Sequence, residues 1–278
     1  MIVERAYAKA NLVLQIGPPR EDRLHPICSL FASLELADEL AVEEHESDVL
    51  ECRGVEGDNL AARALDAIRE AAPGTIPLLR IRIDKRVPVA AGLGGGSADA
   101  AAVLRGANEI AGRPLGTDAL RAIAARVGSD VPSQIEPRHA LVCGVGEEVE
   151  PVSIPPAAVL LVPATEGLRT AEAYAELDRL EAWRERLDPE RVREAVAAPL
   201  PRLAEAVEND LQRAVLSLRP ELESKLAELR EAGALASAVT GSGPTAFGLF
   251  ATEEEAHRAA AALPGAIVTR TRRIPAAA

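Results

Sequence analysis

The sequence has few aromatic residues and no long apolar stretch. Phe, Trp and Tyr make up 2% of the 278 residues, whereas hydrophobic residues as a whole make up 48%. The core must therefore be built mainly from Ala, Val, Leu and Ile. No segment reaches the roughly 20 apolar residues of a membrane span, and residues 1–10 lack the apolar run of a signal peptide. We therefore expect a cytoplasmic protein with no membrane partner.

Cysteine is also scarce, and negative charges outnumber positive ones. Cys28, Cys52 and Cys143 are odd in number and far apart, which fits neither a disulfide framework nor a zinc site and indicates free thiols. The 31 Lys and Arg residues face 43 Asp and Glu residues, for a net charge of -12. A nucleic-acid binder normally carries a basic face, so we expect no nucleic-acid partner. Anionic substrates would have to be held by local amides and a few cationic side chains.

The common nucleotide-binding motifs are missing. A Rossmann fingerprint read from Gly92 ends at Ser97 and one read from Gly94 ends at Asp99, so both fail. The chain contains no Gly-Lys pair, which excludes a Walker A loop. The His-Arg-Asp and Asp-Phe-Gly motifs of protein kinases are also absent.

Periodic patterns predict strands and helices in both halves of the chain, which is typical of an α+β protein with two domains. In the first half we expect a strand over 6–16, helices over 58–72 and 117–128, and strands over 78–83 and 140–145, with Ser97, Asp99 and Thr117 as capping residues. In the second half we expect a strand over 159–162, helices from 170 to 232, strands over 235–240 and 245–250, a helix over 253–263 and a strand over 266–274. Pro151, Pro155 and Pro156 mark the junction, and we place the domains at 1–153 and 154–278.

Four glycines fall within residues 92–96, directly before a predicted helix. Glycines let the backbone approach a ligand closely, and a helix start offers free N–H groups that attract anions. A plain strand-to-helix turn is the alternative, but it needs only one or two glycines. The loop therefore favours a phosphate-binding site without a cationic side chain.

The loop Gly92-Leu93-Gly94-Gly95-Gly96-Ser97-Ala98 resembles the phosphate loop of the GHMP kinases, the family of galactokinase, homoserine kinase and mevalonate kinase. Other segments resemble the family in its own order. They are Ala8-Lys9-Ala10-Asn11-Leu12, His25 with Leu30-Phe31, Asp58-Asn59-Leu60, Gly128-Ser129-Asp130-Val131-Pro132, Gly144-Val145-Gly146-Glu147, Asn209-Asp210-Leu211 and Gly241-Ser242-Gly243-Pro244-Thr245. The resemblance covers essentially the whole chain.

This resemblance implies an ATP-binding N-terminal domain like domain 2 of ribosomal protein S5, a ferredoxin-like C-terminal domain, and transfer of the γ-phosphate of ATP to an alcohol. Lys9 and Asp130 correspond to the family's catalytic lysine and aspartate. ATP would be bound, with Mg²⁺ as its magnesium complex, by the loop residues Pro88, Val89, Ala90, Ala91, Gly92, Leu93, Gly94, Gly95, Gly96, Ser97 and Ala98. No residue is identified as a metal ligand.

The three consecutive glycines are similar to one branch of the family, whose acceptor is the 2-hydroxyl of cytidine diphosphate-linked methylerythritol in isoprenoid precursor biosynthesis. The substrate-binding residues implied are Asn11, His25, Thr170, Tyr174, Gly241, Ser242 and Gly243. The branch usually has an aromatic residue before its histidine, where this chain has Leu24.

Simpler interpretations stand beside these. Asp130 caps a turn, Lys9 is a solvated edge-strand lysine, His25 is a surface histidine, residues 241–244 form a hairpin turn, and Tyr174 packs on a helix. At the level of function, the alternatives are a kinase of another small alcohol and a catalytically silent ligand-binding paralogue. The chain is expected to be a monomer or a homodimer.

Overall fold

The computed structural model describes residues 1–54 and 59–274. They form two compact units: Met1–Ala8, Leu36–Val89 and Gly94–Pro137 make the first, and Lys9–Glu35, Ala90–Leu93 and Arg138–Ala278 make the second. Strands β1 (Ile2–Ile16) and β2 (Ile27–Glu44) each contribute residues to both units. Each unit consists of three separate segments, so the two units do not meet at one boundary along the chain. The domain boundary between residues 153 and 154 stays a prediction. Across the described ranges, no helix combines the length and apolarity that crossing a membrane requires.

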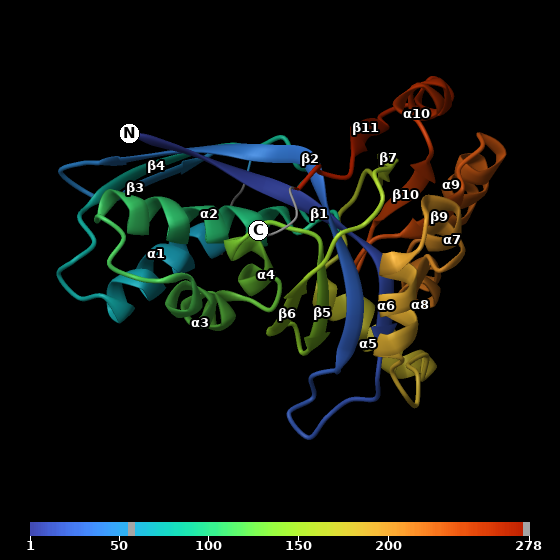
Figure 1. The fold of residues 1–278 in the computed structure, drawn as a ribbon, viewed down its shortest axis with the longest axis horizontal. Helices are drawn as coiled ribbons and strands as arrows, with labels where there is room; N and C mark the ends of the chain where they lie inside the picture. The colour runs from blue at the N-terminus through green and yellow to red at the C-terminus, as the bar shows by residue number, and fades with distance from the viewer. Residues whose placement is uncertain (55–58, 275–278) are drawn as a thin grey trace. The chain divides into compact units, whose positions relative to one another are not determined.

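The first unit packs helices against a small group of strands (Figure 1). Its elements are β3 (Val49–Cys52), α1 (Leu60–Ala71), β4 (Leu79–Asp84), α2 (Gly95–Ile110), α3 (Thr117–Val127) and α4 (Val131–Ile135). Strand β4 pairs antiparallel with the end of β2, from Glu39 opposite Asp84 to Glu44 opposite Leu79, and parallel with β3. Among the described residues, the core cluster here contains no aromatic side chain, as the composition predicts. Five alanines of α2 belong to it, namely Ala98, Ala100, Ala101, Ala102 and Ala107.

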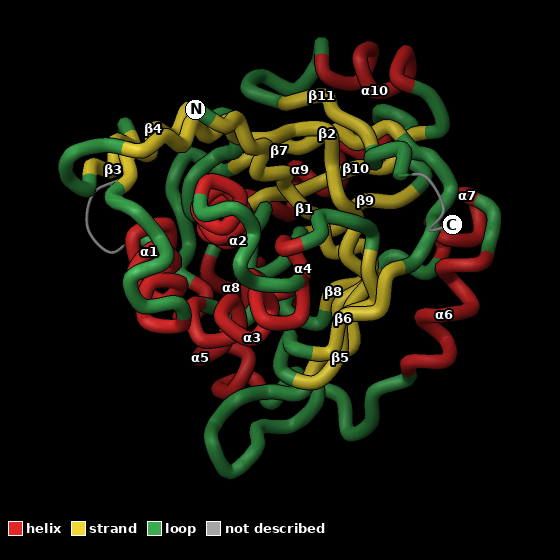
Figure 2. Tube along the Cα trace, turned by 60° about the vertical axis from the view of Figure 1, so that its left-hand side comes forward, coloured by secondary structure: helices red, strands yellow, loops and turns green. Residues whose placement is uncertain are grey.

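The second unit contains a four-stranded antiparallel sheet in the order β11-β7-β10-β9 (Figure 2). Its elements are β5 (Ala140–Gly144), β6 (Glu148–Pro151), β7 (Ala158–Pro163), α5 (Thr170–Leu180), α6 (Pro189–Ala197), α7 (Leu200–Glu205), β8 (Glu208–Asn209), α8 (Gln212–Leu218), α9 (Glu221–Glu231), β9 (Ala236–Val239), β10 (Thr245–Phe250), α10 (Glu253–Ala260) and β11 (Ile267–Arg270). Strand β5 pairs with the start of β2, where Cys28 lies opposite Cys143 with the two thiol sulfurs 3.7 Å apart.

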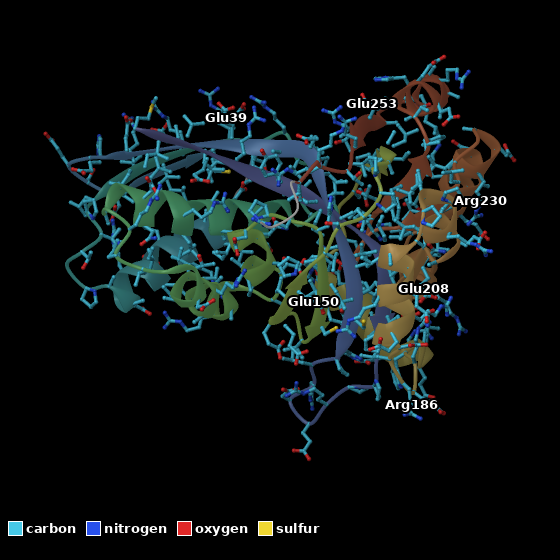
Figure 3. The ribbon with its side chains drawn as sticks, viewed as in Figure 1. Glu39, Glu150, Arg186, Glu208, Arg230 and Glu253 are labelled. Atoms are coloured by element: carbon cyan, nitrogen blue, oxygen red, sulfur yellow. The ribbon has the colours of Figure 1, made fainter. Side chains whose placement is uncertain are left out.

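Strand β8 was not predicted, because it depends on residues far away in the chain. It pairs in parallel with Val13 and Leu14 of β1. Glu208, labelled in Figure 3, accepts a hydrogen bond from the Gln15 amide at 3.0 Å and pairs with Arg184 at 2.8 Å. A segment of two residues carries no readable period, so the region from 170 to 232 looks entirely helical in sequence.

Three capping predictions are wrong. Helix α2 begins at Gly95, with Gly94 in the left-handed conformation as its N-cap, so Ser97 and Asp99 lie inside the helix. Helix α3 is preceded by Gly116 as N-cap, and Thr117 is its first residue. In α1 the cap is Asn59, whose side chain accepts from the N–H of Ala61 at 2.9 Å. Asp58, the first residue of that predicted helix and of the Asp-Asn-Leu segment, lies outside the described residues.

Candidate active site

Lys9 and Asn11 lie on the same face of β1 and are both buried. Their exposed fractions are 4% and 2%, whereas β8 pairs with β1 only at Val13 and Leu14. Burial therefore shows that the interpretation of Lys9 as a solvated lysine is wrong. The ammonium group donates to Asn11 Oδ1 at 2.6 Å and lies 4.5 Å from the centroid of the Phe31 ring. A buried ammonium group requires such partners because desolvation is costly.

Asn11 is held by hydrogen bonds on both its side chain and its backbone. Its Nδ2 donates to Ser29 Oγ at 2.8 Å, and that hydroxyl donates to the carbonyl of Val13 at 2.6 Å. The backbone N–H of Asn11 donates to Thr240 Oγ1 at 3.0 Å. These contacts leave Asn11 Oδ1 directed at Lys9, so the position of the ammonium group is fixed by neighbours on β1, β2 and the end of β9.

The glycine loop and the C-terminal glycine turn touch each other at Gly92. Gly92 has a φ of +74°, and a Cβ built there would lie 2.4 Å from the carbonyl oxygen of Thr240 and 2.8 Å from that of Gly243. A Cβ on Gly241 would lie 2.8 Å from the carbonyl oxygen of Gly92 and 3.5 Å from the Lys9 ammonium. The backbone N–H of Lys9 also donates to the carbonyl of Leu93 at 2.9 Å. Glycine is thus required where two backbones approach beside a lysine.

The turn over residues 241–244 joins β9 to β10, as a hairpin turn does. The same turn also contacts the glycine loop, so the two interpretations of these residues are compatible. Asn209 braces this turn, because its Nδ2 lies 2.7 Å from the carbonyl oxygen of Val239 and 2.9 Å from that of Gly241. The hydroxyls of Thr170 and Ser242 are 2.9 Å apart. The structure therefore brings Lys9 and Asn11 together with residues 92–93 and the glycine turn, and joins Thr170 to Ser242.

Loop residues 88, 89 and 94–98 belong to the first unit. Gly94 there and Ala90 in the second unit both have positive φ values, +69° and +52°, which is uncommon for alanine. The first turn of α2 contains no acidic side chain, and Gly96 at that turn is exposed. The first turn of a helix has N–H groups without acceptors inside the helix, so this end of α2 is suited to bind an anion.

Asp130 also belongs to the first unit, where it directly precedes α4. It occupies the N-cap position, but its side chain makes no capping hydrogen bond. The hydroxyl of Ser133 donates to its backbone carbonyl at 2.8 Å instead. The interpretation of Asp130 as a simple capping residue is therefore wrong.

His25 lies among aromatic side chains rather than on an open surface. It is 7% exposed, and its Nδ1 donates to the carbonyl of Gly17 at 2.8 Å. Its Nε2 lies 3.0 Å from a carboxylate oxygen of Asp178. The ring centroids of Tyr174 and Trp183 are 5.4 Å and 6.0 Å away.

Trp183 is the single tryptophan of a chain poor in aromatic residues, and it lies in no motif that would predict its place beside His25. Leu24, at the position where the family has an aromatic residue, is 51% exposed. The aromatic rings beside His25 are those of Trp183 and Tyr174. Tyr174 is also partly buried against the core of the second unit, so its packing and its contact with His25 coexist.

No group of three or more His, Cys, Asp or Glu side chains is placed to hold a metal ion within residues 1–54 and 59–274. A magnesium ion bound to nucleotide phosphates does not need such a group, because Mg²⁺ usually keeps several waters and takes only one or two protein carboxylates.

The chain matches two family models along its length. Residues 59–136 match the GHMP kinases N terminal domain, and residues 190–268 match the GHMP kinases C terminal domain. Proteins named 4-diphosphocytidyl-2-C-methyl-D-erythritol kinase are similar to it over nearly their whole length. The protein from Nocardia farcinica is 40% identical over 97% of this chain and 92% of its own, and the one from Anaeromyxobacter sp. is 42% identical over 95% and 87%.

Solved structures agree with these matches. A crystal structure of 4-(cytidine 5'-diphospho)-2C-methyl-D-erythritol kinase has a TM-score of 0.82 and 35% identity, covering 98% of this chain and 100% of its own. Homoserine kinase from Cytophaga hutchinsonii has a TM-score of 0.70 and 17% identity, covering 97% and 93%, and shares the fold. The predicted two-domain fold of mixed helices and strands is thereby confirmed. The chain belongs to the GHMP kinase family and is a small-molecule kinase.

Proposed function

We propose that this kinase transfers the γ-phosphoryl group of ATP to the 2-hydroxyl of 4-diphosphocytidyl-2-C-methyl-D-erythritol, a step in isoprenoid precursor biosynthesis. The observation that carries the proposal is the similarity, at about 40% identity and nearly full length, to proteins that bear the name of this activity.

ATP would be held chiefly by backbone groups of residues 88–98. Positive φ values at Ala90, Gly92 and Gly94 curve the loop, and the first turn of α2 follows it without an acidic side chain. This arrangement suits the phosphates, because backbone N–H groups can bind them despite the net charge of -12. Mg²⁺ would enter as the magnesium complex of ATP and neutralise phosphate charge.

Lys9 and Asp130 are the proposed catalytic residues. Asp130 would accept the proton of the acceptor hydroxyl as its oxygen bonds to the γ-phosphorus and the bond to the β,γ-bridging oxygen breaks, releasing ADP. Lys9 would stabilise negative charge in the transition state, because its ammonium group is already desolvated and positioned by Asn11. Phosphoryl transfer asks mainly for such positioning and neutralisation.

His25, Tyr174 and Trp183 form the proposed site for the cytosine of the acceptor. Bases stack on aromatic side chains with about 1–3 kcal/mol per base, and the ring of His25 is fixed by the Gly17 carbonyl. Asn11, Thr170 and the glycine turn at Gly241, Ser242 and Gly243 are proposed to bind the rest of the acceptor. Trp183 compensates for the missing aromatic residue at position 24.

Further parts of the proposal concern the whole chain. We propose a domain boundary near residues 153/154, a cytoplasmic location, a monomeric or homodimeric state, and no nucleic-acid partner. The two family matches lie on opposite sides of that boundary.

The experiment is a kinase assay with a panel of acceptors. Purified protein is incubated with Mg-ATP and 4-diphosphocytidyl-2-C-methyl-D-erythritol, homoserine, mevalonate or galactose, and ADP release is followed by a coupled assay. Asp130→Ala serves as the inactive control, and phosphorus NMR of the product identifies the phosphorylated hydroxyl.

Turnover with the cytidine-containing acceptor alone, lost in Asp130→Ala, is the expected result. Turnover with another alcohol would refute the proposed acceptor but leave the kinase activity. No ADP release with any acceptor, while ATP still binds, would favour a silent ligand-binding paralogue.

A further inference from the structure

A buried cluster of one cation and two anions lies at the base of the glycine loop within the first unit. The ammonium group of Lys85 donates to Asp38 Oδ2 at 2.5 Å and to Asp99 Oδ2 at 2.7 Å. The side chains of Asp38 and Asp99 are 0% and 5% exposed, and that of Lys85 is 11% exposed. None of the three side chains has a role in the proposed chemistry, so the cluster requires a separate explanation.

The three residues come from the elements on either side of the loop. Lys85 follows β4 and immediately precedes the loop, whereas Asp99 lies in the second turn of α2, immediately after it. Asp38 on β2 ties the entrance of the loop, because its Oδ1 accepts the backbone N–H groups of Arg86 at 2.5 Å and Val87 at 2.7 Å. The cluster therefore joins the two ends of the loop to each other and to the sheet.

Packing at Gly95 reinforces this connection. A Cβ built on Gly95, the first residue of α2, would lie 3.0 Å from the side chain of Val87 and 3.4 Å from the Lys85 ammonium. The start of the helix is thus in close contact with the segment that enters the loop. Between these fixed ends, Ala90 holds a positive φ, a conformation that costs energy for a residue with a Cβ and needs support from its surroundings.

The charges of the cluster do not balance when both carboxyl groups are ionised. One oxygen of Asp99, Oδ1, is buried without a hydrogen-bond partner. Burial raises the pKa of Asp99 to about 7, against the opposing attraction of Lys85. With a proton on Asp99 the cluster is neutral, which removes a negative charge from the second turn of the helix proposed to face the phosphates.

We propose that Lys85, Asp38 and Asp99 are positioning residues that clamp the two ends of the glycine loop and thereby set the affinity of the enzyme for ATP. The inference rests on the proposed function in one respect, namely that this loop binds the phosphates. It assigns a specific role to side chains that hold the two ends of the loop.

The test compares variants of the clamp with a matched ion pair on the same helix. Lys85→Met and Asp99→Ala break the clamp, and Asp99→Asn keeps an oxygen that can accept from Lys85. Glu4→Gln is the control, because Glu4 pairs with Arg105 of α2 at 2.8 Å in the same unit but away from the loop. For each variant the KM of ATP, the KM of the acceptor and kcat are measured, together with thermal unfolding.

Lys85→Met and Asp99→Ala are expected to raise the KM of ATP by about 10-fold or more, since hydrogen bonds to charged groups are being lost. The KM of the acceptor should stay within about 2-fold of wild type, and Asp99→Asn should give a smaller effect than Asp99→Ala. A merely structural role would reduce the amount of active enzyme, and hence the apparent kcat, without this selective change in the KM of ATP.

If Lys85→Met and Asp99→Ala fold and their KM for ATP is unchanged, as is expected for Glu4→Gln, the proposed clamp is refuted. Equal increases for both substrates would also overturn it. Should either variant be unfolded, Lys85→Arg supplies the same test, because a planar guanidinium does not reproduce the geometry of an ammonium group between two carboxylates. A wild-type enzyme that shows no ATP-dependent turnover would instead refute the proposed function.

Discussion

Replacing Gly92 by alanine should destabilise the protein by a steric effect that can be separated from backbone strain. The φ of +74° imposes a cost on any residue with a Cβ, about 1–2 kcal/mol for the left-handed region. The added methyl group would also lie 2.4 Å and 2.8 Å from two backbone oxygens of residues 240 and 243. Backbone atoms cannot rotate away as a side chain can, so overpacking should add about 1–3 kcal/mol.

Gly112→Ala is the matched control for this substitution. Gly112 has a φ of +81°, and nothing lies within 4 Å of a Cβ built on it, so it incurs the conformational cost alone. We expect Gly92→Ala to lower the free energy of unfolding by about 1–3 kcal/mol more than Gly112→Ala, as measured by urea denaturation followed by circular dichroism.

Gly92→Ala should also impair catalysis, because the displaced turn carries the Thr240 hydroxyl that anchors Asn11 beside Lys9. The value of kcat/KM is expected to fall for Gly92→Ala and to stay near that of wild type for Gly112→Ala. Equal losses of stability in the two variants would refute the steric argument, since no contact would then distinguish the two sites.

The remaining predictions concern charge, stacking and pH. Lys9→Met should lower kcat by about 100-fold or more while the KM of ATP changes little, and a wild-type kcat would refute a role in transition-state stabilisation. Trp183→Ala should raise the KM of the cytidine-containing acceptor by about 10-fold, with Trp183→Phe recovering most of it; equal values for all three proteins would show that the base does not stack there. Asp99 has its pKa raised from 3.8 in the unfolded chain to about 7 in the folded state. Between these two pH values the native protein therefore binds more protons than the unfolded chain, and it loses stability as the pH rises from about 4 to about 7. The free energy of unfolding, measured by urea denaturation, should therefore favour wild type over Asp99→Asn more at about pH 5 than at about pH 8, and a pH-independent difference would contradict the assignment.

Sequence patterns predicted several elements but missed short ones and also the longest strand, β2, for which no strand was expected. The alternation in residues 6–16 and the apolar run near 159–162 lie in β1 and β7 as expected. Helix α4 and strand β8 were missed, because five and two residues are too few to show a period. Helix starts were misplaced at Ser97 and Thr117, since glycine supplied the cap where a side chain was expected.

The candidate site was predictable where it depends on a local motif and not where it depends on distant contacts. The glycine loop and Lys9 stand out as residue patterns. The contact of Gly92 with Thr240, the burial of His25 against Trp183, and the link from Lys85 to Asp38 all join segments far apart in the chain. No single window of the sequence carries that information.

The long-range anchoring of Asn11 has a consequence for synthesis on the ribosome. Its backbone N–H donates to the Thr240 hydroxyl, which lies 229 residues later in the chain. At about 5–20 residues per second, that partner is made roughly 10–45 s after Asn11. Strand β1 would meanwhile expose a buried lysine face and the edge that later pairs with β8. Strand β1 therefore cannot complete its native contacts until almost the whole protein has been translated.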